Sequence, residues 1–323
     1  MKRPTQKETN PFPYSDSNKR YRTYDWFLRE RFGCKVAKIP LAADFTCPNI
    51  DGKKGVGGCI YCASGSGKFN APVCMPIEEQ YETMLASMRK KWNVTKTIPY
   101  FQAHTNTYAP TRVLEPMFRR AVSLPGAVGL AVATRADCIS KSCARLLSDI
   151  GKETFLTVEL GLQTANDNTA TLINRCHSYG DFLRGYYLLK ESGNIGICVH
   201  LILGLPGETR EDMLRTVKQV AMLRPEQVKF HLLYVLKDTP LGNMYLSGSY
   251  TPMTREEYVS VLAEALEYLP PETVIGRVTG DAPAADLLAP EWSRKKLTVI
   301  DELDKLLFES ARYQGIANQS ATL

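Results

Sequence analysis

The sequence predicts an α/β fold built from six successive β/α units, arranged either as a parallel barrel or as an open, doubly wound sheet. Short apolar segments alternate along the chain with longer segments whose apolar residues recur at helical spacing. Several of the short segments are apolar on both faces, as parallel strands covered by helices are. With 323 residues, 44% of them hydrophobic, the chain can bury a large core as one domain or as one and a half.

The six units follow one another without an internal repeat. The expected strands span 34–42, 97–105, 129–135, 154–163, 195–207 and 227–236. The expected helices span 76–92, a segment from about 111, 140–150, further helices through 193, then 209–223 and about 254–268. Because parallel α/β folds bind ligands at the carboxyl ends of their strands, we expect functional residues just after each strand.

The composition indicates a globular protein of the cytoplasm. No amino-terminal segment has the pattern of a signal peptide, and no window approaches the roughly 20 apolar residues that a membrane span needs. Nine cysteines are an odd number for a secreted disulfide scaffold. In a reducing compartment, clustered thiols are better interpreted as metal ligands or core residues.

Three cysteines lie in one glycine-rich loop after the first expected strand, at Cys47, Cys59 and Cys62. The loop reads CPNIDGKKGVGGCIYC, and its glycines allow the backbone to wrap a bound group closely. Structural zinc is one interpretation, but its fourth ligand would have to be Cys34 or Cys74, neither of which belongs to a second C-x2-C pair.

A phosphate-binding loop is a second interpretation of this region. The segment SGSGKF at 64–69 has Phe69 where such a loop needs serine or threonine, and Cys62 stands at the position of its first glycine. The phosphate-binding interpretation therefore fails.

An iron–sulfur cluster is the third interpretation, because thiolates suit iron and three protein ligands on a four-iron cube leave one iron open. That iron can chelate the amino and carboxylate groups of S-adenosylmethionine (SAM). An electron from the cluster can then cleave the sulfonium bond to give a 5′-deoxyadenosyl radical.

The cysteine loop resembles that of the radical SAM superfamily. The stretch FTCPNIDGKKGVGGCIYC, with SGSGKF, is similar to the YhcC-like branch and to the radical domain of the Elongator catalytic subunit. The C-x11-C-x2-C spacing departs from the common C-x3-C-x2-C but is similar to the long loop of this branch. The resemblance covers roughly residues 20 to 310.

The resemblance implies a partial (β/α)6 TIM-like barrel with a short N-terminal arm and a C-terminal α/β extension. The expected domains are a basic arm at 1–30, a core barrel at 31–250 and an extension at 251–323. The implied activity is reductive SAM cleavage at an oxygen-sensitive [4Fe–4S] cluster held by the three loop cysteines. The implied electron donor is a protein such as flavodoxin or ferredoxin.

The resemblance also implies SAM contacts at successive strand ends. Gln102, Thr105 and Asn106 stand where the superfamily receives the methionine amino group, and Gln163 and Arg175 where it binds the amino acid end. The backbone near Leu203 and Gly204 is placed to read adenine, while His200 replaces an acidic ribose ligand whose role can pass to Glu159. Three structural alternatives stay open: a polar plug of Glu159 with Gln163, a surface ion pair at Arg175, and a simple turn at GLPGE.

The substrate class rests on charge and on resemblance. Lys19, Arg20 and Arg22 lie among tyrosines, and WSRKK at 292–296 is basic, so both segments suit RNA. The resemblance to Elongator points to the wobble uridine of a tRNA. Two alternatives remain: a radical enzyme for a small metabolite or porphyrin, and a zinc-bound RNA-binding module.

Overall fold

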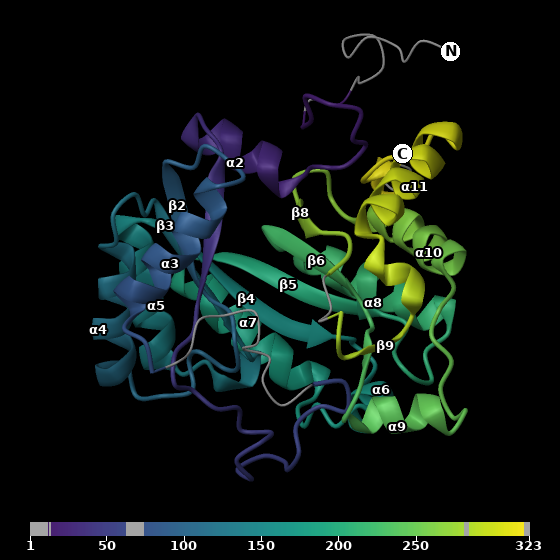
Figure 1. The fold of residues 1–323 in the computed structure, drawn as a ribbon, viewed down its shortest axis with the longest axis horizontal. Coiled ribbons are helices and arrows are strands. Elements are labelled where there is room, and N and C mark those ends of the chain that lie inside the picture. Colours follow the sequence, from purple (N-terminus) through teal and green to yellow (C-terminus); the bar gives the residue numbers. More distant parts are fainter. Residues whose placement is uncertain (1–11, 13, 63–73, 281–283, 320–323) are drawn as a thin grey trace. The chain divides into compact units, whose positions relative to one another are not determined.

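The structure is a computed structural model that describes residues 12, 14–62, 74–280 and 284–319 (Figure 1). Seven strands are hydrogen bonded in the order β1-β2-β3-β4-β5-β6-β8, and β7 pairs with β9 in a second sheet. The first six strands therefore follow one another as they do along the chain. A doubly wound sheet reverses its strand order at a switch point. The observed order excludes that alternative and confirms the expected α/β fold.

The chain divides into two compact units. We call Leu28–Leu162 with Asn174–Val199 the cysteine-loop unit, and Met1–Phe27 with Gln163–Ile173 and His200–Leu323 the C-terminal unit. Helix α2 (Tyr24–Phe32) and strand β5 (Gly196–Leu203) contribute residues to both units.

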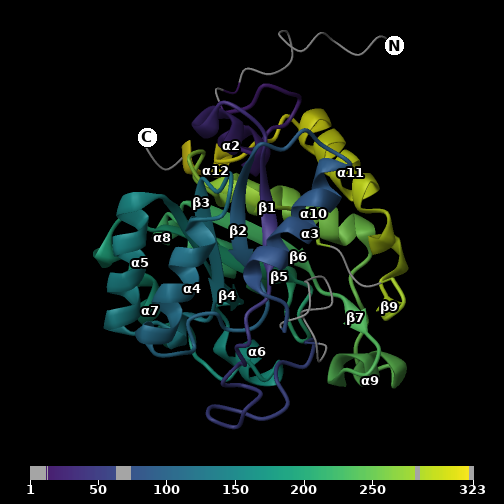
Figure 2. The same cartoon turned by 60° about the vertical axis from the view of Figure 1, so that its left-hand side comes forward.

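The cysteine-loop unit is a series of parallel strands and their helices (Figure 2). Its strands are β1 (Val36–Leu41), β2 (Lys96–Phe101), β3 (Gly129–Thr134) and β4 (Phe155–Gln163). Its helices are α3 (Ile77–Arg89), α4 (Thr111–Val122), α5 (Lys141–Glu153) and α7 (Tyr179–Ser192), with a short 3-10 turn η1 (Ala136–Cys138). Val36 pairs with Lys96, and Gly129 with Phe155. All six residues of β3 are buried, as expected for a strand covered on both faces.

The C-terminal unit combines helices with the last strands. Its helices are α6 (Asp167–Leu172), α8 (Arg210–Leu223), α9 (Pro240–Leu246), α10 (Arg255–Tyr268), α11 (Lys296–Glu309) and α12 (Ile316–Gln319), with a 3-10 turn η2 (Glu291–Arg294). Its strands are β6 (Gln227–Leu232), β7 (Val235–Leu236), β8 (Val274–Arg277) and β9 (Leu287–Ala289). Helix α10 packs against both α8 and α11, and its buried side chains form the core of this unit.

Helix starts follow capping signals in the sequence. Thr209 before α8 accepts a hydrogen bond from the backbone of Asp212, whose carboxylate accepts one in return from the Thr209 backbone. Ser178 before α7 and Thr254 before α10 begin the same reciprocal capping box. Each such cap contributes about 1 kcal/mol, which fixes where the helix begins.

The described part of the basic N-terminal segment packs within the C-terminal unit. Lys19 forms an ion pair with Asp304 of α11, and the Arg20 guanidinium lies 5.2 Å from the ring centroid of Phe308. Arg22 donates a hydrogen bond to the backbone carbonyl of Glu272 at 2.9 Å. These residues therefore pack on the C-terminal unit and do not form a solvated arm. Each of the three cations contacts another group of the protein, so these contacts stabilise the fold.

Strand β2 ends earlier than the sequence predicts, at Phe101 instead of 105. The Asn106 amide nitrogen donates to the backbone carbonyls of Phe101, Ala103 and Ala133, so the chain turns back immediately after the strand. Side-chain bonds to backbone of this kind compete with sheet pairing. The expected strand at 227–236 is likewise divided, into β6 and β7.

Gly185 of α7 tests how closely this helix packs on η1. A Cβ atom at Gly185 would lie 2.1 Å from the backbone oxygen of Ala136, and backbone atoms cannot easily move away. We expect Gly185→Ala to lower the free energy of unfolding by about 1–3 kcal/mol, measured by urea denaturation. Gly180→Ala in the same helix is the control, because its nearest contact would be an ordinary 3.6 Å. Equal stability of the two variants would contradict the close packing.

Candidate functional site

The long cysteine loop folds back on itself, which brings its second and third cysteines toward the first. The backbone N–H groups of Ile50 and Asp51 both donate to the carbonyl of Cys47. Gly58 N–H then donates to the Asn49 carbonyl at 2.8 Å, so the residue just before Cys59 is bonded close to Cys47. The eleven intervening residues thus form a compact turn. The segment SGSGKF at 64–69 lies outside the described residues.

The thiols of the loop interact electrostatically. Cys62 keeps an exposed surface, but the protein atoms around its sulfur, together with the charges of Cys59 and Cys47, raise the pKa of its thiol to about 12. Burial also raises the pKa of Cys59, and three polar groups act against it: a hydrogen bond from the Tyr61 hydroxyl, the charge of Arg135, and a hydrogen bond from Asn49. The surroundings of Cys59 and Cys62 thus disfavour their thiolate forms, while Cys59 is supplied with donors.

The three cysteines are spaced more widely than a single zinc ion requires. A zinc ion with Zn–S bonds of about 2.3 Å holds its sulfur ligands about 3.8 Å apart. Among the described residues, Cys47, Cys59 and Cys62 do not form a group whose sulfur atoms all lie within 4.8 Å of one another. A four-iron cube binds each thiolate to a different iron and so tolerates a wider spacing.

Arg135, just after β3, is a charged residue near the thiols that the sequence interpretation missed. Its Nε and Nη2 donate to the two carboxylate oxygens of Asp137 at 3.0 Å, and Nη1 donates to the backbone carbonyl of Arg175 at 2.9 Å. Burial alone would lower the pKa of Arg135, but the bonds to Asp137 and the nearby Cys47 charge raise it. The guanidinium therefore stays cationic beside the thiolates.

The loop after β2 carries three of the predicted SAM contacts. Gln102 is half-buried, and Thr105 is buried with its backbone N–H bonded to the carbonyl of Thr46, one residue before Cys47. The Asn106 side chain is fully buried, and its amide nitrogen donates to three backbone carbonyls, as described above. Thr105 thus joins this loop to the start of the cysteine loop, and Asn106 joins it to β3.

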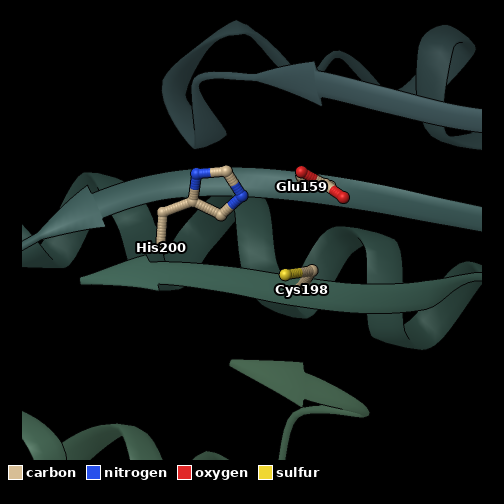
Figure 3. Close-up of side chains that lie close together, drawn as sticks. All are labelled: Glu159, Cys198 and His200. Atoms are coloured by element: carbon tan, nitrogen blue, oxygen red, sulfur yellow. The ribbon is translucent and has the colours of Figure 1, made fainter. Parts of the chain in front are cut away.

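Glu159 of β4 is 1% exposed, and both of its carboxylate oxygens have partners. Oε1 forms an ion pair with Lys38 of β1, and Oε2 accepts a hydrogen bond from the Tyr100 hydroxyl at 2.6 Å. Figure 3 shows Glu159 on β4 with Cys198 and His200 on β5, whose potential ligand atoms all lie within 4.8 Å of one another. Glu159 therefore has partners within the protein, Lys38 and Tyr100, which differ from the Gln163 pairing of the structural alternative.

Arg175 lies in the turn between α6 and α7 and is 2% exposed. Its Nε and Nη2 donate to the carbonyl of His177 at 3.0 and 2.8 Å, and Nη1 donates to the carbonyl of Leu162. The alternative of a surface ion pair is therefore wrong. Burial, followed by the Arg175 charge, lowers the pKa of His177 to about 3, so this imidazole is neutral.

In the C-terminal unit, Gly204 follows β5 with a positive φ of 89°. Its carbonyl accepts a hydrogen bond from the Tyr250 hydroxyl at 2.8 Å, and the Leu203 carbonyl accepts one from the Leu233 N–H at 3.3 Å. A Cβ atom at Gly204 would lie 3.1 Å from the Met253 side chain, so a larger residue would be crowded there. These backbone groups therefore have internal partners. Gln163, at the end of β4, also has a positive φ, of 69°.

Comparison with known proteins decides the family. Residues 53–220 match the Radical SAM superfamily, and residues 225–309 match the Radical_SAM C-terminal domain. The chain belongs to the radical SAM superfamily. It is 41% identical to the uncharacterized protein YtqA of Bacillus subtilis, over 95% of this chain and 96% of that protein. It is 36% identical to protein YhcC of Escherichia coli, over 87% of this chain and 90% of that protein.

Two further matches extend the comparison. Over 161 residues, 49% of this chain and 29% of that protein, the chain is 30% identical to tRNA uridine(34) acetyltransferase of Methanocaldococcus jannaschii. The structure of the archaeal Methanocaldococcus infernus Elp3 superposes with a TM-score of 0.66 at 19% identity. That match covers 86% of this chain, which spans only 64% of the Elp3 chain.

Membership in this superfamily confirms several expectations. The protein is an enzyme, its cofactors are a [4Fe–4S] cluster and SAM, and its fold is the partial TIM-like barrel of the radical SAM type. The zinc-bound RNA-binding module is thereby excluded. Within the described residues, no helix is both long and apolar enough to cross a membrane.

The cysteine assignment predicts a loss of iron. Anaerobic reconstitution of a variant with Cys47, Cys59 and Cys62 all changed to alanine should give no [4Fe–4S] cluster, measured by iron and sulfide analysis and by absorbance. Cys34→Ala is the matched control, because Cys34 precedes β1 and its sulfur lies 4.0 Å from the Thr95 hydroxyl. A full complement of four irons in the triple variant would contradict the assignment.

Proposed function

We propose that this enzyme uses radical SAM chemistry to modify a tRNA, with the wobble uridine as the target. The observation that carries the proposal is the 30% identity to a tRNA uridine(34) acetyltransferase over half of the chain. The match covers less than a third of that protein, so the proposal takes over the RNA substrate and the radical chemistry and leaves out acetyl transfer.

In this proposal Cys47, Cys59 and Cys62 hold the cluster, and the strand ends around them receive SAM. When bound, the two cofactors supply a 5′-deoxyadenosyl radical, which can take hydrogen from an unactivated C–H bond. Arg135 stays cationic beside the thiolates and offsets part of the negative charge that the loop gathers. A nucleoside in an unpaired anticodon loop can be presented to such a site, whereas a paired base cannot. The proposed reductant is flavodoxin or ferredoxin.

A basic patch on the cysteine-loop unit supports RNA binding. We define the patch as Lys35, Lys90 and Lys91, with Trp92 between them and the start of β2. The Lys35 ammonium lies 4.7 Å from the ring centroid of Trp92, and this ring is 47% exposed. Neighbouring lysines and an exposed aromatic face are the combination that binds phosphates and stacks on bases.

The patch adds to the RNA contacts expected at Lys19, Arg20 and Arg22, which each have a partner within the protein. Val36 and Lys96 are register partners at the start of β1 and β2, so the patch lies at the amino-terminal ends of these strands. The cysteine loop follows the carboxyl end of β1. A six-residue strand spans about 20 Å, so an RNA that contacts the patch must extend at least that far to reach the cysteines.

Substitution of the patch should weaken tRNA binding in a salt-dependent way. Lys90 and Lys91 are exposed at the end of α3. We expect the double change of both to glutamine to lower the slope of log affinity against log salt by about 0.7–0.9 for each phosphate that the variant no longer binds. Lys305→Gln on α11, also exposed, is the control. Identical salt slopes for the double variant and the control would remove the patch from the proposal.

The substrate class is tested by comparing modified nucleosides in cells. Total tRNA from cells with and without the gene should differ in a modified uridine, measured by mass spectrometry of the digested RNA. Complementation with the triple cysteine variant should fail to restore it. If no nucleoside changes and the protein has no salt-sensitive affinity for tRNA, the substrate is a small metabolite or porphyrin instead.

A further inference from the structure

Asn49 is the polar side chain most directly coupled to the thiols of the cysteine loop. It lies two residues after Cys47 and is 0% exposed. Its amide nitrogen lies 3.6 Å from the sulfur of Cys59, within hydrogen-bond range for sulfur. The same nitrogen donates to the backbone carbonyl of Asn174.

The turn after α6 fixes the orientation of this amide. The Asn174 side chain donates to the backbone carbonyls of Val56 at 3.1 Å and Gly58 at 2.7 Å, so it is bonded to the cysteine loop on both sides of Gly57. If the Asn49 amide were turned over, its oxygen would face the Asn174 carbonyl and the Cys59 sulfur, and both are acceptors. The nitrogen must therefore face Cys59.

The other end of the amide is packed without room for movement. The Asn49 oxygen is buried and has no hydrogen-bond partner among the described residues. A Cβ atom at Gly55 would lie 2.4 Å from this oxygen and 2.6 Å from the sulfur of Cys176. An unpaired buried acceptor is unfavourable for folding. The loop nevertheless keeps this amide, whose nitrogen reaches the sulfur of Cys59.

We propose that Asn49 is a positioning residue that donates an N–H hydrogen bond to the Cys59 thiolate and thereby makes the cluster easier to reduce. A hydrogen bond to a ligating sulfur withdraws negative charge from it, which favours the state that carries one more electron. The Tyr61 hydroxyl donates to the same sulfur. Cys59 therefore has two donors, and Asn49 is the one held in place by a second segment of the chain.

This inference rests on ligation of the cluster by the three cysteines and does not depend on the tRNA substrate. The iron content of the reconstituted wild-type protein and of the triple cysteine variant tests the ligation. The reduction behaviour of Asn49 variants tests the hydrogen bond. Failure of the cysteine ligation can thus be distinguished from failure of the Asn49 hydrogen bond.

The experiment compares Asn49→Ala and Asn49→Asp with the wild type after anaerobic reconstitution. At a fixed solution potential near the wild-type midpoint, the ratio of reduced to oxidised cluster, measured by electron paramagnetic resonance, should fall about tenfold in Asn49→Ala. Asn49→Asp should fall further, because an aspartate of the same shape places a negative acceptor beside the thiolate. Iron content should stay at four per chain in both.

Gln80→Ala is the matched control, because Gln80 is also a fully buried amide, and it is bonded to the backbone of Ala42 and Met75 outside the proposed cofactor site. A general loosening of the fold would change both residues' variants alike, whereas a hydrogen bond to Cys59 would change only the Asn49 variants. An unchanged reduced fraction in Asn49→Ala, or a change equal to that of Gln80→Ala, would overturn the proposal. So would failure of both Asn49 variants to bind four irons while Gln80→Ala does, since Asn49 would then serve loop structure alone.

Discussion

The constraint on which the cysteine-loop unit depends is the cost of gathering three thiolates in a partly desolvated loop. The charges of Cys59 and Cys47 contribute to raising the pKa of Cys62 to about 12. The surrounding chain offsets part of this cost with a cation, Arg135, and with the amide and hydroxyl donors of Asn49 and Tyr61. These three groups all act on the sulfur of Cys59 and work against the rise in its pKa.

A segment more than a hundred residues downstream holds those donors in place. The Asn174 side chain donates a hydrogen bond to the backbone of the cysteine loop. The carbonyl of the adjoining Arg175 accepts a hydrogen bond from Arg135, and the Arg175 guanidinium donates to two other backbone carbonyls. The Asp137 carboxylate in turn keeps Arg135 in one orientation, and its pKa falls to about 2 because the guanidinium bonds outweigh the effect of burial. An irregular loop is therefore supported by side chains from β3 and from the turn before α7.

The sequence predicted the strands of the core well, because a strand buried on both faces needs an unbroken apolar run and such runs are easily recognised in the sequence. The ends of elements were harder to predict. β2 stops at Phe101 because Asn106, five residues later, bonds back to its last carbonyl. The ion pair of Lys19 could not be predicted either, because its partner, Asp304, lies 285 residues away in the sequence. Asn49 and Tyr61 stood within the cysteine motif itself, but their contacts depend on how the loop folds.

The same limit applies to the predicted SAM contacts. A polar residue at the end of a buried strand must be compensated, and its local sequence does not reveal whether the compensation comes from a ligand or from the protein. At Glu159 the protein supplies Lys38 and Tyr100, and at Arg175 it supplies the carbonyls of Leu162 and His177. At Cys59 and Cys62 the surroundings instead raise the pKa of the thiol, so the protein does not fully compensate the thiolate form that a metal ligand needs. This difference, more than the order of polar residues along the chain, is our reason for proposing that a cofactor completes the interaction at the cysteines.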